Sequence, residues 1–160
     1  MKKKYRFAGV VVGMLILIAL AYGLTQASIS ALPAPGSLET GMATSIRDWL
    51  IARAARTIPQ PGLPDNATTV SKGKTLYGMG CASCHGQDAR APTPIGRSMY
   101  PRVPDLGSTR VQSLSDQELF WVIKNGIRLS GMPGFARINT DNQIWQLVYY
   151  VRSIGKPAKK

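Results

Sequence analysis

The sequence contains little of the chemistry that most enzymes and metal sites use. Its 160 residues include one histidine, His85, and two cysteines, Cys81 and Cys84. These three ligands are too few for a structural zinc site, which takes four from Cys and His. The sequence also has no Ser-His-Asp set, no evident pair of catalytic carboxylates and no phosphate-binding loop. It therefore gives no sign of hydrolytic or phosphoryl-transfer catalysis.

Acidic residues are also scarce, with eight Asp and Glu against 20 Lys and Arg, a formal charge of +12. This balance suits nucleic acid, anionic lipid or an acidic protein partner. Nucleic acid is the weakest of the three, because no basic run is interleaved with aromatic residues. From Thr68 onward, 13 Lys and Arg stand against five acids. We therefore expect partners with acidic docking surfaces.

Charge is absent altogether between Phe7 and Leu38, directly after a basic start. The apolar run from Phe7 to about Ile29 has about the 20 residues that a membrane-crossing helix needs. Basic flanking residues remain in the cytoplasm, so the rest of the chain is expected on the outer, periplasmic side. Residues 1–30 are predicted to be an uncleaved single-pass anchor in the cytoplasmic membrane. A signal peptide cleaved after residues 25–27 is the alternative.

The stretch Cys81-Ala82-Ser83-Cys84-His85 contains every Cys and His of the chain. This spacing is that of a c-type haem attachment site, in which both sulfurs form thioether bonds to the haem and the imidazole binds the iron. A thioredoxin-like dithiol would follow a strand, and the sequence before Cys81 has no strand pattern. A disulfide between Cys81 and Cys84 would close too small a loop to stabilise much. We predict one covalently bound haem c, attached to Cys81 and Cys84, with His85 as an axial ligand.

Prolines and glycines separate the anchor from this motif, and residues 31–69 are predicted to be a linker. Within the linker, apolar residues recur at helical spacing over about 41–57. This stripe consists of Met42, Ile46, Trp49, Leu50 and Ala54. Its partner is the haem domain, the membrane surface or another subunit.

The segment before the motif is expected to form a helix. Thr68 or Thr69 would cap it. Because residues four apart share one face of a helix, Gly73, Tyr77 and Cys81 would lie in one row.

The segments after the motif alternate between irregular and helical patterns. Residues 86–107 are rich in Pro and Gly and are expected to form an irregular loop. Ser115 and Glu118 form a capping box, which starts a helix that ends at Asn125-Gly126. Thr140 or Asp141 caps a last helix that runs to about Ile154.

In this order of elements, residues 70–155 resemble the class I cytochromes c. The resemblance implies an all-α fold wrapped on one haem, here with an N-terminal transmembrane helix and a basic tail at 156–160. It also implies that Gly73 and Tyr77 of the first helix meet Leu147 and Tyr150 of the last. The small membrane-tethered cytochromes c of bacterial respiratory chains are the nearest likeness.

The second axial ligand is expected to be a methionine, because His85 is the only imidazole. Met79 is tied to the His85 side of the haem by the nearby thioether and cannot pass round it. Met99 and Met132 remain within the domain. We favour Met132, since it lies in a Gly- and Pro-containing loop and precedes the closing helix as the family's ligand Met does. Met99 is the alternative, and is more simply a packing residue.

Further roles around the haem rest on the resemblance and on charge. Pro104 resembles the family's Pro whose carbonyl accepts a hydrogen bond from the ligand His, with Pro94 as the alternative. Arg97 and Arg102 are candidate partners of the haem propionates. Trp121 either lines the haem crevice or is an ordinary core aromatic.

Our leading hypothesis is a one-electron carrier with a His/Met-ligated haem, which is not an enzyme, takes no small-molecule substrate and serves redox proteins of a respiratory chain. One alternative is a haem subunit of a larger oxidase or dehydrogenase. Another is a haem enzyme or gas sensor with an open axial site. Carbon monoxide binding to the reduced protein would distinguish this last alternative from a carrier.

Overall fold

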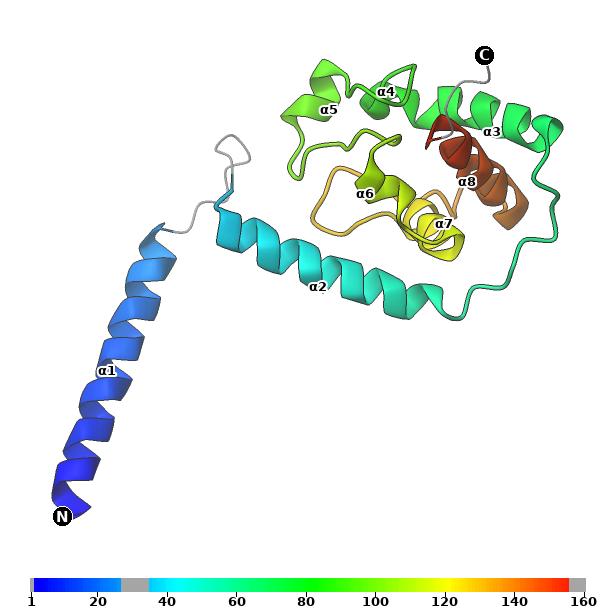
Figure 1. Ribbon diagram of the computed structural model, residues 1–160. Coiled ribbons are helices and arrows are strands. Elements are labelled where there is room, and N and C mark those ends of the chain that lie inside the picture. Colours follow the sequence, from blue (N-terminus) through cyan, green and yellow to red (C-terminus); the bar gives the residue numbers. More distant parts are fainter. Residues whose placement is uncertain (1, 27–34, 156–160) are drawn as a thin grey trace. The chain divides into compact units, whose positions relative to one another are not determined.

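The computed structural model describes residues 2–26 and 35–155. It divides the chain into two compact units, Met1–Pro33 and Ala34–Lys160. Every regular element within the described ranges is a helix (Figure 1), and the predicted all-α class is confirmed. The possible cleavage site at residues 25–27 is described only to Gln26, and the basic tail at 156–160 lies outside the described residues.

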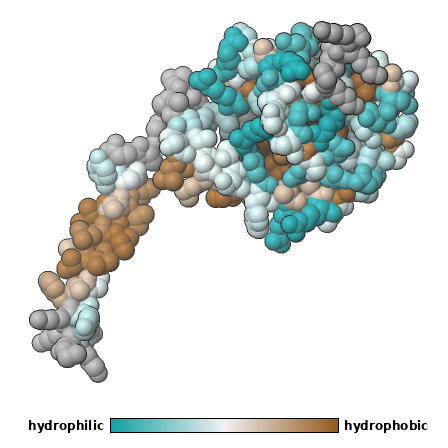
Figure 2. Space-filling view, in the orientation of Figure 1, coloured by the Kyte–Doolittle hydropathy of each residue, from teal (hydrophilic) through white to brown (hydrophobic). Residues whose placement is uncertain are grey.

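The first unit contains the helix α1, Lys2–Gln26. Its stretch Phe7–Thr25 comprises 19 residues with a mean hydropathy of 2.5. The large apolar side chains of this stretch are exposed, and Figure 2 shows them as a dense brown band. By length and composition α1 can therefore cross a bilayer.

The core of the second unit lies among three long helices: α3, Ala67–Gly80; α7, Asp116–Asn125; and α8, Asp141–Gly155. The rings of Tyr77 on α3 and Tyr150 on α8 lie 5.1 Å apart, as the resemblance implied for this pair. Phe120 on α7 stacks on Trp145 of α8 with centroids 4.4 Å apart. Leu147 is buried but lines a pocket next to the haem attachment motif.

The start of α3 differs from the prediction. Asn66 is its N-cap, and the Asn66 side chain accepts a hydrogen bond of 2.9 Å from the backbone N–H of Thr69. Thr68 and Thr69 are therefore residues of the first turn, because Asn66 is an equally good capping residue two positions earlier.

The capping boxes of the two later helices follow the sequence closely. Ser115 Oγ accepts from the Glu118 N–H at 3.2 Å, and Glu118 accepts in return from the Ser115 N–H at 2.6 Å, which confirms the predicted start of α7. At α8, Thr140 Oγ1 accepts from the Gln143 N–H at 3.4 Å, and Gln143 accepts from the Thr140 N–H at 2.8 Å. Thr140 is thus the cap of the last helix.

Three short helices interrupt the irregular chain between α3 and α7: α4, Ala82–His85; α5, Pro94–Ser98; and α6, Thr109–Gln112. The Gln112 side chain donates to the carbonyl oxygens of Leu106, at 2.7 Å, and Val151, at 3.0 Å. The backbone carbonyl of Gln112 accepts from Arg152 at 2.8 Å. Through this one residue, α6 joins the loop that follows the motif to α8.

The linker helix α2, Ser37–Ala55, packs against α7. Its buried residues are Ile51 and Ala55. The helix therefore does contact the haem domain, which was one of the three partners considered. The predicted stripe is not what makes this contact, since Met42, Ile46, Trp49 and Leu50 are all at least half exposed.

Candidate haem site

The Cys-x-x-Cys-His motif forms a single helical turn directly after α3. The backbone N–H of Cys81 still bonds to the Tyr77 carbonyl of α3, at 2.8 Å. Cys84 and His85 both donate from the backbone to the Cys81 carbonyl, at 3.1 and 3.0 Å. Gly86 ends the turn with a φ of 83°, a conformation that favours glycine. Two thiols and one imidazole are thereby presented from one turn of rigid backbone.

The imidazole of His85 is held by a backbone carbonyl across the loop. Its Nδ1 lies 3.3 Å from the carbonyl oxygen of Pro104. With the proton on Nδ1 donated to this carbonyl, Nε2 keeps a free lone pair for a metal. Burial lowers the pKa of His85, which favours the neutral form that metals bind. Pro94, the alternative carbonyl, begins the short helix α5 instead.

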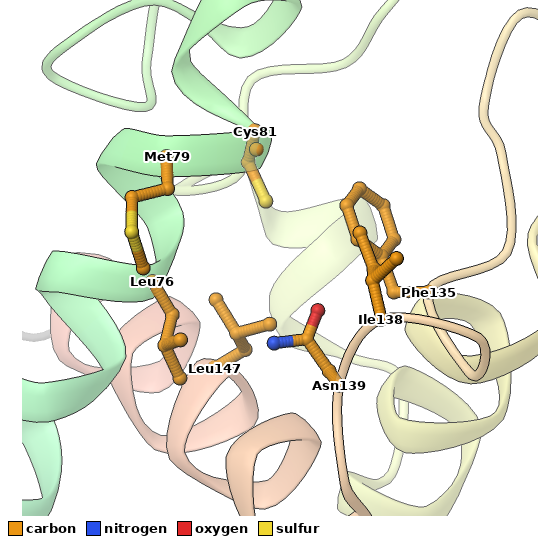
Figure 3. Close-up of a pocket in the computed structure, with 8 residues that line it drawn as sticks. Leu76, Met79, Cys81, Phe135, Ile138, Asn139 and Leu147 are labelled. Carbon is orange, nitrogen blue, oxygen red and sulfur yellow. The ribbon is translucent and has the colours of Figure 1, made fainter.

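Cys81 and Cys84 are half-buried thiols that are not joined to each other. Burial, and then the neighbouring Cys84, raise the pKa of Cys81 to about 11. Beside Cys81 lies a largely apolar pocket lined by Leu76, Met79, Gly80, Cys81, Phe135, Ile138, Asn139 and Leu147. Figure 3 shows the Cys81 sulfur directed towards the space between Phe135 and Leu147. These apolar walls suit the edge of a flat apolar ring attached at Cys81, and the donor set fits a haem c.

The loop after α7 is closed on itself by hydrogen bonds around Met132. Gly126 turns the chain with a φ of 70°. The Ile127 N–H donates to the Met132 carbonyl at 3.2 Å, and the Met132 N–H donates to Ser130 Oγ at 3.1 Å. Met132 is half-buried and packs against the hydrophobic core. A defined loop, rather than a free one, therefore presents this thioether.

The other candidate ligand, Met99, lies against the same loop. A β-carbon on Gly131 would fall 2.5 Å from the Met99 sulfur. A side chain at position 131 would therefore have to displace the Met99 thioether. The fold brings both candidate sulfurs to one region, and the choice of Met132 stays a prediction.

The three other residues predicted around the haem, Arg97, Arg102 and Trp121, lie in the segments that follow the motif. Arg97 is exposed on α5 and donates to the Pro92 carbonyl at 2.7 Å. Arg102 is exposed in the loop that precedes Pro104. Trp121 is half-buried on α7. The residues that line the pocket include Phe135, in the loop after α7, and Leu147 on α8. The propionate and crevice roles therefore stay predictions.

Two contacts at the site were missed in the sequence. The Tyr77 hydroxyl, which is buried, donates to the Gly86 carbonyl at 2.6 Å and so fixes the end of the haem-binding turn. Phe135 approaches Gly80 so closely that a β-carbon there would lie 2.9 Å from the ring. Both contacts join an aromatic residue to a glycine. The sequence could not have indicated them, because glycines and aromatic residues occur throughout the chain.

Comparison with known proteins gives a consistent result. The family described as "Cytochrome C oxidase, cbb3-type, subunit III" matches residues 68–151. The Cbb3-type cytochrome c oxidase subunit CcoP of Azospirillum brasilense is 33% identical over 91 residues, 56% of this chain and 30% of that protein. CcoP of Azospirillum sp. (strain B510) is 27% identical over 126 residues, 75% of this chain and 42% of that protein. The chain thus matches less than half the length of either CcoP.

Two further similarities concern a smaller protein and the fold. Cytochrome c-554(547) of Halothiobacillus neapolitanus is 40% identical over 47 residues, 29% of this chain and 46% of that protein. Among solved structures, a chain of the Kuenenia stuttgartiensis reducing HAO-like protein complex Kustc0457/Kustc0458 aligns with a TM-score of 0.53. It is 24% identical, and the match covers 63% of this chain and 53% of that one, which supports the helical fold.

Proposed function

Because the chain belongs to the cytochrome c oxidase, cbb3-type, subunit III family, we propose that it is a membrane-tethered c-type cytochrome that transfers single electrons between redox proteins. The observation that carries this proposal is the turn from Cys81 to His85, with its imidazole beside the Pro104 carbonyl. The same turn adjoins an apolar pocket. It offers two attachment points and one axial nitrogen, and this donor set matches no hydrolytic chemistry.

Each residue of the site has a distinct task in this proposal. Cys81 and Cys84 would hold the haem through thioether bonds, and His85 would bind its iron through Nε2. Met132 would offer its sulfur to the same iron. The haem, when bound, provides an iron centre that gains and loses one electron reversibly. Pro104 keeps the imidazole oriented, and Phe135 and Leu147 keep water from the pocket.

If both His85 and Met132 bind the iron, no position would remain open for a substrate, so we propose a carrier with one haem that is not an enzyme. Potentiometric titration of the purified full-length protein tests this proposal. We expect one Nernstian one-electron transition and no change in the reduced spectrum under carbon monoxide. A carbon monoxide adduct of the wild-type protein would instead favour the gas sensor or haem enzyme.

The CcoP relatives favour a second candidate, in which the chain is a haem subunit of a larger oxidase. Both CcoP proteins are oxidase subunits by name, and both are more than twice as long as the matched region. Purification in mild detergent distinguishes the two candidates. A free carrier elutes as a small particle, whereas a subunit elutes with oxidase polypeptides and haems in fixed proportion.

The excess of positive charge supports partners with acidic docking surfaces. Residues from Thr68 onward carry 13 Lys and Arg against five acids. Attraction between such surfaces is screened by salt over a Debye length of about 8 Å at physiological ionic strength. Electron-transfer rates with membranes of the same cell should therefore fall as salt rises. Rates that are equal at low and high salt would rule out steering by charge.

A further inference from the structure

The helix α2 is held to the haem domain along one side. Ile51 and Ala55 are each 4% exposed, and α2 packs on α7. Asp48, which lies on the same side of the helix at 100° per residue, pairs with Arg110 of the haem domain at 3.4 Å. These contacts fix α2 as part of the folded unit and leave large apolar side chains exposed on its other side.

That other side carries a second apolar surface, which we call the outer stripe. The exposed fractions of its side chains are 75% for Leu38, 58% for Met42, 56% for Ile46, 60% for Trp49 and 50% for Leu50. At 100° per residue these positions cluster opposite Ile51 and Ala55. The buried residues Ile51 and Ala55 hold α2 to the haem domain by the reverse side, and the exposed Glu39 within the outer stripe accepts a hydrogen bond from Tyr100 at 3.1 Å. A contiguous exposed apolar stripe of this kind marks an interaction surface.

The chain itself restricts what can cover the outer stripe. Residues 27–36 connect the apolar helix α1 to the first residue of α2, Ser37. At the length of an extended chain they span about 35 Å at most. If α1 crosses a bilayer, the start of α2 is never far from the membrane surface. The bilayer is then the apolar phase that the outer stripe meets at the highest local concentration.

The polar residues beside the outer stripe suit the headgroups of lipids. The Arg53 guanidinium lies 5.7 Å from the centre of the Trp49 ring. Arg56 is exposed at the end of the helix, on the same side as Leu38. Trp residues favour the membrane interface, and arginines beside an apolar face bind anionic headgroups. A stripe of apolar residues with Trp and Arg side by side is typical of a helix that lies in the interface.

We propose that α2 lies on the membrane, with the outer stripe inserted among the headgroups of anionic lipid and Arg53 and Arg56 bound to their phosphates. The haem domain would then be attached to the bilayer at two places, through α1 and through the outer stripe of α2. This proposal rests on the proposed membrane-spanning role of α1 but not on electron transfer, so it stands even if the protein is not an electron carrier.

Spin labels on the full-length holoprotein test the proposal in vesicles of phosphatidylcholine and phosphatidylglycerol at 3:1. One label replaces Ile46 on the outer stripe (Ile46→Cys), and the control replaces the exposed Ser71 on α3 (Ser71→Cys). In the holoprotein the sulfurs of Cys81 and Cys84 would be bound to the proposed haem, and the wild-type protein treated with the same spin label measures any reaction at these two residues. We expect the label at 46 to lose most of its collisions with a water-soluble nickel reagent and to gain collisions with oxygen. It should lie about 5–10 Å into the boundary between the headgroups and the acyl chains.

Two outcomes would overturn the proposal. A label at 46 that meets the nickel reagent as often as the label at 71 lies in water. A label at 46 that is shielded from both nickel and oxygen lies against protein, either a partner or a second copy of this chain. Either result rejects the bilayer as the occupant of the outer stripe.

A second variant separates membrane contact from folding. Trp49→Asp should return the label at 46 to water, with the haem spectrum and the thermal midpoint unchanged, because Trp49 points away from the domain. Vesicles of phosphatidylcholine alone should hold the label less deeply if anionic headgroups contribute. An equal depth in both kinds of vesicle would refute the role given to Arg53 and Arg56.

Discussion

Gly73 of α3 and Tyr150 of α8 lie so close that a β-carbon on Gly73 would fall 2.9 Å from that of Tyr150 and would collide with the carbonyl oxygen of Gln146. Because backbone atoms cannot move aside, Gly73→Ala should lower the free energy of unfolding by about 1–3 kcal/mol. Gly78→Ala in the same helix is the matched control, since nothing lies within 4 Å of its β-carbon. It should raise stability by about 1 kcal/mol. Denaturant unfolding of the holoprotein measures both, and equal effects would contradict the close approach of the helices.

Tyr77→Phe removes the buried hydrogen bond to the Gly86 carbonyl, which measures 2.6 Å. The cost should be about 1–2 kcal/mol at neutral pH, because the carbonyl also loses its partner. Burial raises the pKa of Tyr77 far above its ordinary value, so the native state keeps this proton where the unfolded state releases it. The advantage of Tyr77 is therefore complete below about pH 10 and shrinks as the pH rises further. Paired unfolding curves from pH 7 to 11 measure this difference, and a gap that stays constant would show that Tyr77 does not contribute it.

Met132→Ala should abolish the weak sulfur-to-iron charge-transfer band of the oxidised protein and open the reduced iron to carbon monoxide. Met99→Ala is the control, because Met99 packs on Gly131 of the same loop. It should keep the band, although its loss of packing lowers stability. The assignment is wrong if Met99→Ala loses the band and Met132→Ala keeps it. Absorption spectra of the two holoproteins decide between the methionines.

Arg152 joins α8 to α6 and α7 through charge-assisted hydrogen bonds. Its Nε lies 2.6 Å from Asp116, with the arginine side chain 19% exposed, and its Nη1 donates to the Gln112 carbonyl at 2.8 Å. Arg152→Ala should cost about 2–4 kcal/mol, because it leaves these acceptors without a partner. Arg110→Ala breaks only an exposed pair with Asp48 at 3.4 Å, and should cost less than about 1 kcal/mol. Thermal unfolding measures the loss of stability in both variants, and a larger loss for Arg110→Ala would contradict this prediction.

The anchor prediction is tested by washing membranes with alkaline carbonate. The uncharged stretch Phe7–Thr25 should keep the full haem signal in the pellet, because a spanning helix resists extraction. Edman sequencing or mass spectrometry of the amino terminus provides the control. A haem signal released entirely into the supernatant, with a new amino terminus near Ser28, would show a cleaved signal peptide instead.

Sequence reasoning succeeded where the deciding interactions are local. The capping box of Ser115 and Glu118 is a pattern within four residues, and it fixed the start of α7. The Cys-x-x-Cys-His turn is equally local. Sequence reasoning failed at the start of α3, because Asn66, Thr68 and Thr69 are all good capping residues and the pattern does not rank them.

Contacts between distant residues were harder to predict. His85 and Pro104 are 19 positions apart in a loop with several prolines, so a family resemblance was needed to suggest their contact. The approach of Met99 to Gly131 had no such guide. In α2, apolar residues occur on both sides of the helix, and periodicity alone could not indicate which side would pack on α7.

The hydrogen bonds that join the loop after the motif to α8 determine how these two segments open. Gln112 bonds to Leu106 in the loop behind the haem-binding turn and to Val151 in the last helix, and Arg90 of the same loop donates to the carbonyl of Ile154. If the loop moves away from the core, its hydrogen bonds to α8 break. If α8 unwinds from its C-terminal end back to Val151, the same hydrogen bonds break. Amide protons in these two segments should therefore exchange with deuterium through one shared opening fluctuation, at closely matched free energies, although they lie far apart in the chain.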